Sequence, residues 1–166
     1  MQMKPYQFGP HPAESAVSAR FARAEHFFEG KRKRLTPIRR RVLETLSVRR
    51  SAMSASKILD QLKTDGKAPH TQVAYRAREF LVEFGFAHKN EHLNTYVACT
   101  RPHAHHTPAF RICRMYDEAT EAPSPASGDT MQRPAQETGF VVAATILKAV
   151  GICPGCLDDA GSKRNT

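Results

Sequence analysis

The chain lacks the features that would place it in or across a membrane. Its first thirty residues contain no apolar segment of the kind found in secretory signal peptides, and Pro5, Pro10 and Pro12 interrupt them. The longest apolar run, Phe140–Leu147, is far too short to span a bilayer. We therefore expect a cytoplasmic protein with no membrane partner.

Cysteine is scarce, with four residues in 166. Thiols are kept reduced in the cytoplasm, so these cysteines suit metal ligation or redox chemistry better than structural disulfides. Two of them form the pair Cys153-Pro-Gly-Cys156, and Cys99 and Cys113 lie upstream. Histidines surround the upstream two, at His88 and within residues 103–106. This concentration of thiols and imidazoles predicts a metal-binding protein.

Acidic residues are few in the first part of the chain. Residues 1–102 carry 19 Lys and Arg against 9 Asp and Glu, a net charge of +10, whereas residues 103–166 carry 6 against 7, a net charge of −1. Between Lys31 and Arg50 there are nine basic residues and one acidic residue, Glu44. Such a charge suits a polyanion, and a solvated helix face is the alternative. A membrane surface is disfavoured because no amphipathic helix with aromatic anchors accompanies the charge.

The basic part of the chain shows the pattern of four helices followed by a hairpin. Thr36-Pro37 and Ser54 are typical helix starts, and helices are also predicted over residues 13–28 and 71–84. Two short strands follow, at Phe86–Lys89 and Thr95–Cys99. Helices followed by a hairpin indicate a winged helix-turn-helix, in which the fourth helix enters the major groove of double-stranded DNA and the hairpin is the wing.

The fourth helix has one predicted buried face and one predicted outer face. Apolar residues at helical spacing form the buried face: Val73, Ala77, Phe80, Leu81 and Phe84. Tyr75 and Arg76 lie off this stripe, and Gly85 is a plausible residue to end the helix. Arg78 has no explanation at this stage.

The second part of the chain predicts a small α/β domain. Strands are expected at Ala109–Cys113 and at residues 120–122, and a short helix at 129–138. Phe140–Ala149 is expected to be a strand that is buried on both faces. The whole chain is therefore predicted to be α+β, with a second domain too small to bury much surface alone.

Six stretches of this sequence, in order and over residues 14–157, resemble the ferric uptake regulator family, and within it the zinc uptake regulators. They are Leu35-Thr-Pro-Ile-Arg39, Ala74-Tyr-Arg-Ala77, Phe84-Gly-Phe-Ala-His-Lys89, Asn94-Thr-Tyr-Val-Ala-Cys99, Phe110-Arg-Ile-Cys113 and Gly151-Ile-Cys-Pro-Gly-Cys156. The resemblance implies a homodimer that binds double-stranded DNA. It also implies a winged-helix DNA-binding domain, placed here at 13–100, a hinge at 101–108 and a dimerisation and metal domain at 109–157. From their composition, residues 1–12 are expected to be disordered and residues 158–166 to form a flexible tail.

The resemblance implies a sensing site for Zn²⁺. The matching positions are His88, Cys99, His106 and Glu121. One thiolate, two imidazoles and a carboxylate suit tetrahedral zinc. His103 and His105 lie near enough to replace His106 as the hinge ligand.

The family also has a structural zinc site made of four cysteines, and this chain matches it incompletely. Cys113, Cys153 and Cys156 are present, but Tyr116 stands where the fourth cysteine is expected. A phenol is a poor zinc ligand at neutral pH. The site is then either a three-thiolate zinc completed by water or Asp117, or empty, and a half-filled thiol cluster also leaves a redox role open.

Five residues are predicted to contact DNA. Tyr75 and Arg76 match the DNA-contacting positions of the family, because tyrosine can touch a thymine methyl group and arginine can bind guanine or phosphate. Arg39, Arg40 and Arg41 belong to the densest basic stretch. The family commonly has an apolar residue at the position of Arg78, so this chain departs from the pattern there.

Together these features predict a zinc-responsive repressor of metal-uptake genes. A relative that senses iron, manganese, haem or peroxide is the alternative within the family, and Cys99 favours zinc over the harder metals. A metal-binding protein without DNA function would not need the Tyr75-Arg76 surface. A zinc enzyme is disfavoured, because the four predicted sensing ligands leave no open position on the metal.

Overall fold

The computed structural model describes residues 14–48, 51–64, 69–91, 93–103, 106–115, 118–122, 129–143 and 145–157. The chain divides into two compact units, Met1–Pro102 and His103–Thr166. The division falls inside the connection that the sequence places at 101–108. The predicted disordered start at 1–12 and the predicted flexible tail at 158–166 lie outside the described residues. Within the described part of the chain, no helix is long and apolar enough to cross a membrane.

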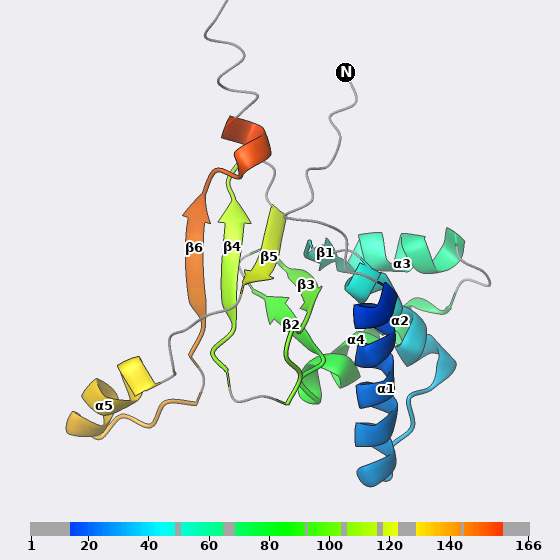
Figure 1. Ribbon diagram of the computed structural model, residues 1–166, viewed down its shortest axis with the longest axis horizontal. Coiled ribbons are helices and arrows are strands. Elements are labelled where there is room, and N and C mark those ends of the chain that lie inside the picture. Colours follow the sequence, from blue (N-terminus) through cyan, green and yellow to red (C-terminus); the bar gives the residue numbers. More distant parts are fainter. Residues whose placement is uncertain are drawn as a thin grey trace, which may run out of the picture. The chain divides into compact units, whose positions relative to one another are not determined.

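The N-terminal unit is a winged helix preceded by one additional helix (Figure 1). Its elements are α1 (Glu14–Gly30), α2 (Pro37–Val48), β1 (Met53–Ser54), α3 (Ala55–Thr64), α4 (Thr71–Glu83), β2 (Ala87–Asn90) and β3 (Thr95–Ala98). The three strands form an antiparallel sheet in the order β1-β3-β2. The predicted winged helix-turn-helix is confirmed. The sequence did not predict β1, which at two residues is too short to show a period.

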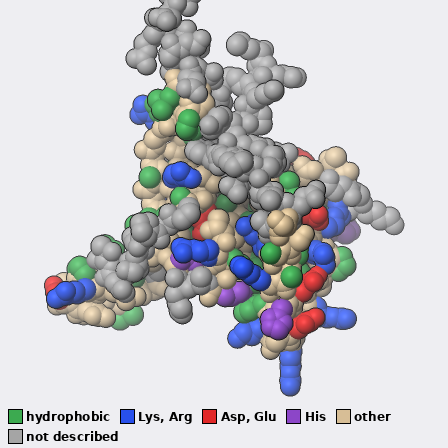
Figure 2. Space-filling model, in the orientation of Figure 1, with side chains coloured by type: hydrophobic (Ala, Val, Ile, Leu, Met, Phe, Trp, Pro, Cys, Tyr) green, Lys and Arg blue, Asp and Glu red, His purple; other side chains and the backbone are tan. Residues whose placement is uncertain are grey.

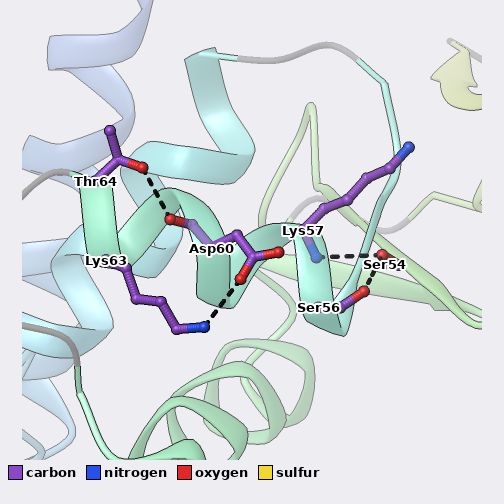
Figure 3. A network of polar contacts seen from close by, with 6 residues as sticks. All are labelled: Ser54, Ser56, Lys57, Asp60, Lys63 and Thr64. Carbon is purple, nitrogen blue, oxygen red and sulfur yellow. Dashed lines mark hydrogen bonds and ion pairs between the residues drawn. The ribbon is translucent and has the colours of Figure 1, made fainter.

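Local capping explains where the middle helices begin. The carbonyl of Thr36 accepts a hydrogen bond from the amide of Arg40 at 2.9 Å, and Pro37 opens α2 as expected for a first helical residue. At α3 the hydroxyl of Ser54 accepts a bond from the amide of Lys57 at 3.3 Å (Figure 3). This bond satisfies an amide that the helix itself leaves unpaired.

The end of α4 is set by Gly85, which adopts a left-handed conformation with φ of 70°. The amide of Gly85 donates to the carbonyl of Val82 at 3.0 Å, and the amide of Phe86 donates to that of Leu81 at 2.8 Å. These two bonds form a Schellman motif, which reverses the chain directly from α4 into β2. The predicted role of Gly85 is confirmed.

The buried face of α4 differs from the prediction at one end. Ala77, Phe80 and Leu81 are buried as expected, but Val73 is 44% exposed, so its predicted burial is wrong. Two buried residues of α4 lie outside the predicted stripe, Ala74 and Arg78. Arg78 therefore lies inside the unit.

Aromatic packing forms the centre of the N-terminal core. The ring of Phe28 from α1 lies 4.9 Å from that of Phe80 and 5.1 Å from that of Phe86, centroid to centroid. Phe84 packs edge-on against Phe28 at 5.4 Å. Buried aliphatic residues of α2 and α3, such as Leu43 and Ile58, complete this core. This core packs α4 and the β2–β3 hairpin against the same set of side chains.

The C-terminal unit contains a second sheet in the order β5-β4-β6. Its elements are β4 (Ala109–Cys113), β5 (Glu118–Ala122), α5 (Asp129–Glu137) and β6 (Leu147–Gly151). Strand β4 pairs with β5 antiparallel and with β6 parallel. The predicted α+β class and the helix at α5 agree with this arrangement.

The last strand corrects the sequence prediction in both position and burial. It spans Leu147–Gly151 rather than Phe140–Ala149, and all five of its residues are exposed. Phe140 and Val141, predicted to be buried, are 66% and 87% exposed. Among the described residues β6 pairs with β4 alone, so the run of apolar residues marks a surface that the described part of the chain leaves exposed.

Candidate metal centres and nucleic-acid interface

His88 and Cys99 lie on one face of the small sheet of the N-terminal unit. His88 of β2 is in register with Val97 of β3, and Cys99 follows two residues later, so all three share a face. The amide of Cys99 donates to the carbonyl of Phe86 at 3.0 Å, which holds the residue beside β2. Cys99 is fully buried, and its Sγ lies within 4.8 Å of a ring nitrogen of His88.

His106 and Glu121 form the second pair, within the C-terminal unit. The Nε2 of His106 lies 3.0 Å from Oε1 of Glu121, and the two side chains are 9% and 1% exposed. Glu121 is placed by its register with Phe110 in the β4–β5 hairpin. An imidazole and a carboxylate this deeply buried and this close are suited to a shared cation.

The structure distinguishes among the three hinge histidines. His106 is half-buried and contacts Glu121, whereas His103 is exposed and has a left-handed backbone with φ of 63°. His105 lies outside the described residues. Among the described histidines of this stretch, His106 is therefore the one placed against a carboxylate.

Three buried thiols meet at the other end of the second sheet. The Sγ atoms of Cys113 and Cys156 are 3.6 Å apart, and those of Cys153 and Cys156 are 3.4 Å apart. The amide of Cys153 points at Sγ of Cys113 at 3.4 Å. A disulfide requires about 2.05 Å between sulfurs, and all three cysteines are free. Ligands of one tetrahedral zinc lie roughly 3.8 Å apart, close to the separations found here.

Cys113 and Cys156 differ in the direction of their pKa shifts. Burial raises the pKa of Cys113, but the amides of Cys153 and Met115 and the neighbouring thiols donate to its sulfur and lower it to about 7. Burial and the hydrogen bonds to Cys153 and Cys113 raise the pKa of Cys156 to about 12.

The predicted fourth position of this thiol site cannot be placed, since Tyr116 and Asp117 lie outside the described residues. Cys113 ends β4, and Cys153 and Cys156 flank one helical turn closed by a bond from the amide of Leu157 to the carbonyl of Cys153 at 3.1 Å. The parallel pairing of β4 with β6 brings Cys113 to that turn.

The two residues predicted to read DNA lie on the outer face of α4. Tyr75 is 51% exposed and Arg76 is also exposed. The next residues on the helix turn inward at Ala77 and Arg78, so Tyr75 and Arg76 stand out from the helix surface. This is the placement that contact with a DNA groove requires.

The three arginines of the basic stretch have contacts within the protein. Arg39 stacks on the ring of Phe80, 3.4 Å from its centroid, and burial lowers the pKa of its guanidinium. Arg40 pairs with Glu25, and Arg41 donates to the carbonyl of Leu62. Each guanidinium has five donors, so these contacts leave donors for phosphate. Their predicted role at DNA stays a prediction.

A group of exposed cations precedes them, at Lys31, Arg32, Lys33 and Arg34. Figure 2 shows Lys and Arg side chains projecting around the C-terminal end of α1, where the chain turns toward α2. Exposed cations gathered on one turn are suited to a phosphate backbone.

The prediction missed the partner of Arg78. Its guanidinium lies over the ring of Tyr96 in β3 and near that of Tyr75. The spacing of Ala74, Ala77, Arg78 and Leu81 along the helix is a signal that could have placed Arg78 inside.

The fold and these donor sets define a winged-helix protein with candidate metal ligands in both of its units. No protein-family profile matches the chain. It is 34% identical over 138 residues to the zinc uptake regulation protein of Escherichia coli K12, covering 82% of this chain and 81% of that protein. The chain belongs to the family of zinc uptake regulation proteins.

Two solved structures resemble it closely. A zinc uptake regulator complexed with zinc and DNA has a TM-score of 0.77 and 32% identity, with 87% of this chain and 97% of that chain covered. The holo form of XcZur has a TM-score of 0.73 and 32% identity, with 88% and 99% covered.

Proposed function

We propose that this protein is a zinc-responsive transcription regulator that represses metal-uptake genes when zinc is bound. The observation that carries the proposal is the pair of ligand sets, His88 with Cys99 and His106 with Glu121, in a protein whose fold includes a winged helix. A relative of 32% identity is complexed with zinc and DNA, which supports the same pairing of ligands here.

The sensing site is one zinc held by both pairs. Two donors from either unit make only half of a tetrahedral set, whereas the four together supply one sulfur, two nitrogens and one oxygen. A metal shared in this way restricts the two units to one relative orientation. The bound zinc supplies only this cross-link, and the four protein ligands leave no open position for catalysis.

Operator recognition depends on α4. Tyr75 and Arg76 face the bases, and the cations from Lys31 to Arg34, with Arg39, Arg40 and Arg41, face phosphate. Contacts with bases determine which DNA sequence is bound. Contacts with phosphates determine the affinity for DNA and its dependence on salt.

The protein acts as a homodimer through its C-terminal unit. Support comes from exposed apolar residues in and near β6, including Val150 at 64% and Ile146 at 50%. Strand β6 is an edge strand, and an exposed edge of this kind is a typical pairing surface. A dimer presents two copies of α4 to successive major grooves.

The thiol set of Cys113, Cys153 and Cys156 holds a second zinc that stabilises the C-terminal unit. The separations of 3.4 and 3.6 Å between sulfurs support this role. With three protein thiolates the fourth position goes to water or to Asp117.

A regulator of iron or manganese is the second candidate, and Cys99 disfavours it because thiolate suits zinc better than hard cations. A metal-binding protein without DNA function would leave the exposed Tyr75-Arg76 surface unused. We further propose that the protein acts in the cytoplasm and is not an enzyme.

The test begins with selection of duplexes from a random pool by the zinc-loaded full-length protein. Binding of the selected duplex is then measured by fluorescence anisotropy with zinc, with a chelator, and with iron or manganese. Binding that requires zinc supports the proposal. Selection of no duplex would leave a metal-binding protein, and equal binding without metal would remove the sensing role.

A further inference from the structure

Arg78 is an unusual residue for the inner face of a helix. It is 6% exposed, and it lies between two tyrosines from different elements of the N-terminal unit. Its Cζ is 5.0 Å from the ring centroid of Tyr96 in β3 and 5.4 Å from that of Tyr75 in α4. Both distances are within the range of cation–π attraction.

Stability alone does not explain an arginine at this position. Burying a guanidinium is costly, and among the described residues no hydrogen bond partner reaches its buried Nε. An apolar side chain, which the resemblance to the family leads one to expect here, would fill the space without that cost. The contacts with the two rings offset only part of it.

The contacts of Arg78 connect the exposed face of α4 with the sheet that carries the wing. Tyr75 stands one turn before Arg78 and is 51% exposed, whereas Tyr96 is 3% exposed in the middle strand of the sheet. The hydroxyl of Tyr96 donates to Oε1 of Glu79 in α4 at 3.3 Å. The guanidinium and this hydrogen bond together tie α4 to β3 at adjacent residues.

We propose that Arg78 is a positioning residue for DNA recognition, which holds the Tyr75 ring in its base-facing orientation and locks α4 to the wing sheet through Tyr96. The proposal rests on the DNA-binding function proposed above. Arg78 presents Tyr75 to B-form DNA in one orientation before binding, so less conformational freedom is lost on binding. The guanidinium is needed because it lies within cation–π distance of both rings at once, and its planar, extended shape spans them as a compact lysine ammonium cannot.

A direct phosphate contact by Arg78 is the competing explanation. It would need an accessible guanidinium, and this one is 6% exposed. A phosphate contact would add affinity for any duplex, whereas orientation of Tyr75 adds affinity only for the selected sequence. Lysine retains charge but cannot stack in a planar manner, so Arg78→Lys separates the two explanations.

The experiment compares the full-length, zinc-loaded parent with Arg78→Leu, Arg78→Lys, Tyr75→Ala and the double variant Tyr75→Ala/Arg78→Leu. Anisotropy is measured with the duplex selected by the parent and with a scrambled duplex. We expect Arg78→Leu and Arg78→Lys to lose about tenfold in affinity for the selected duplex and less than about threefold for the scrambled one. The melting temperature of Arg78→Leu and the zinc content of both variants should not fall.

The double variant provides the decisive comparison. If Arg78 acts through Tyr75, Arg78→Leu should have little further effect once Tyr75 is alanine. Equal losses on both duplexes, parental affinity in Arg78→Lys, or additive losses in the double variant would overturn the proposal.

A second variant serves as the control for loss of folding. Arg78→Met keeps an unbranched side chain and is used if Arg78→Leu does not fold. If neither folds, Arg78 serves the fold and the proposal is overturned. Failure of the parent to select any duplex would instead contradict the DNA-binding function itself, so the two failures are distinguishable.

Discussion

Arg76 and Cys99 show how the environment of single residues assigns their roles. Arg76 is exposed on α4, where a guanidinium remains hydrated and available to a ligand. Cys99 is fully buried beside the half-buried His88, where a thiolate would be costly without a cation. Helix α4 thus carries the proposed DNA surface, and the β2–β3 hairpin carries proposed metal ligands.

At the residue scale we predict that Arg76→Ala weakens binding of the selected duplex by about 1–3 kcal/mol, because a bidentate contact with a base is lost. Anisotropy titrations at several salt concentrations measure the effect. Lys63→Ala is a control, since Lys63 is occupied with Asp60 at 3.0 Å on the surface of α3. Parental affinity in Arg76→Ala would show that α4 does not read the sequence through this residue.

A second residue-scale prediction concerns the sensing ligands. Cys99→Ser should abolish zinc-dependent DNA binding while leaving a folded protein, since serine is a far weaker zinc ligand than thiolate. His88→Ala should behave in the same way. Zinc titrations monitored by anisotropy, with circular dichroism as the check on folding, measure both. A Cys99→Ser protein that zinc still switches would remove this site from the mechanism.

At the scale of elements, β4, β6 and the turn that follows β6 create the thiol site, and β6 also forms an exposed apolar edge. The parallel register of β4 with β6 places Cys113 opposite Gly151, two residues before Cys153. A strand pairing therefore determines whether distant cysteines become one set of ligands. The same strand leaves Val150 on the surface.

Completing the thiol site with a fourth cysteine should strengthen zinc binding. Tyr116→Cys should raise both zinc retention against a chelator and the melting temperature, because a fourth thiolate strengthens metal binding and metal affinity is linked to folding. Metal analysis and thermal melts measure the two quantities, with Tyr116→Ser as the matched control. If the cysteine variant gains no zinc and Cys153→Ser melts as the parent does, the thiols hold no structural metal.

The apolar edge predicts an effect on assembly. Val150→Glu should shift the homodimer toward monomer, since it puts a charge into the exposed apolar surface that we propose as the dimer interface. Val48→Glu is a matched control, because Val48 is 43% exposed at the end of α2 in the other unit. Sedimentation at several protein concentrations distinguishes the two. Unchanged dimerisation in Val150→Glu would place the interface elsewhere.

At the scale of the whole molecule, the proposed function is a coupling between two ligands. Candidate metal ligands occur in both units, and α4 belongs to the first of them. If one zinc takes ligands from both, metal and DNA favour the same arrangement of the protein. Coupling of this kind is reciprocal by thermodynamic necessity.

This reciprocity predicts how zinc binding and DNA binding affect one another. The factor by which zinc tightens binding of the selected duplex should equal the factor by which that duplex tightens zinc binding, about 5- to 150-fold for typical coupling energies. Competition with a chromophoric chelator, with and without duplex, measures zinc affinity. A scrambled duplex is the control. Duplex that leaves zinc affinity unchanged would contradict coupling through the sensing site.

Much of the fold follows from local patterns in the sequence. The caps at Thr36-Pro37 and Ser54 and the left-handed Gly85 are short-range features, so helices and wing could be predicted within a few residues. The apolar spacing along α4 did not predict burial correctly at the N-terminal end of the helix. Val73 fits a helical stripe, yet it lies beyond the edge of the core and is exposed.

The chemistry of the candidate sites was also present in the sequence. Thiols, imidazoles and a carboxylate in family order predicted the ligand sets, because metal preference depends on donor type. Position along the chain did not distinguish His103 from His106. That distinction came from β5, which places Glu121 3.0 Å from the His106 ring.

The sequence by itself thus determined the class of the elements, the basic charge of the first half and the donor atoms available to metal, because each depends on residue type and near neighbours. Only the tertiary structure decided that Arg78 lies between two tyrosines, that three separated thiols meet, and that the apolar run near β6 is exposed. Those facts depend on which strands pair and which faces pack, and such contacts join residues far apart in the chain.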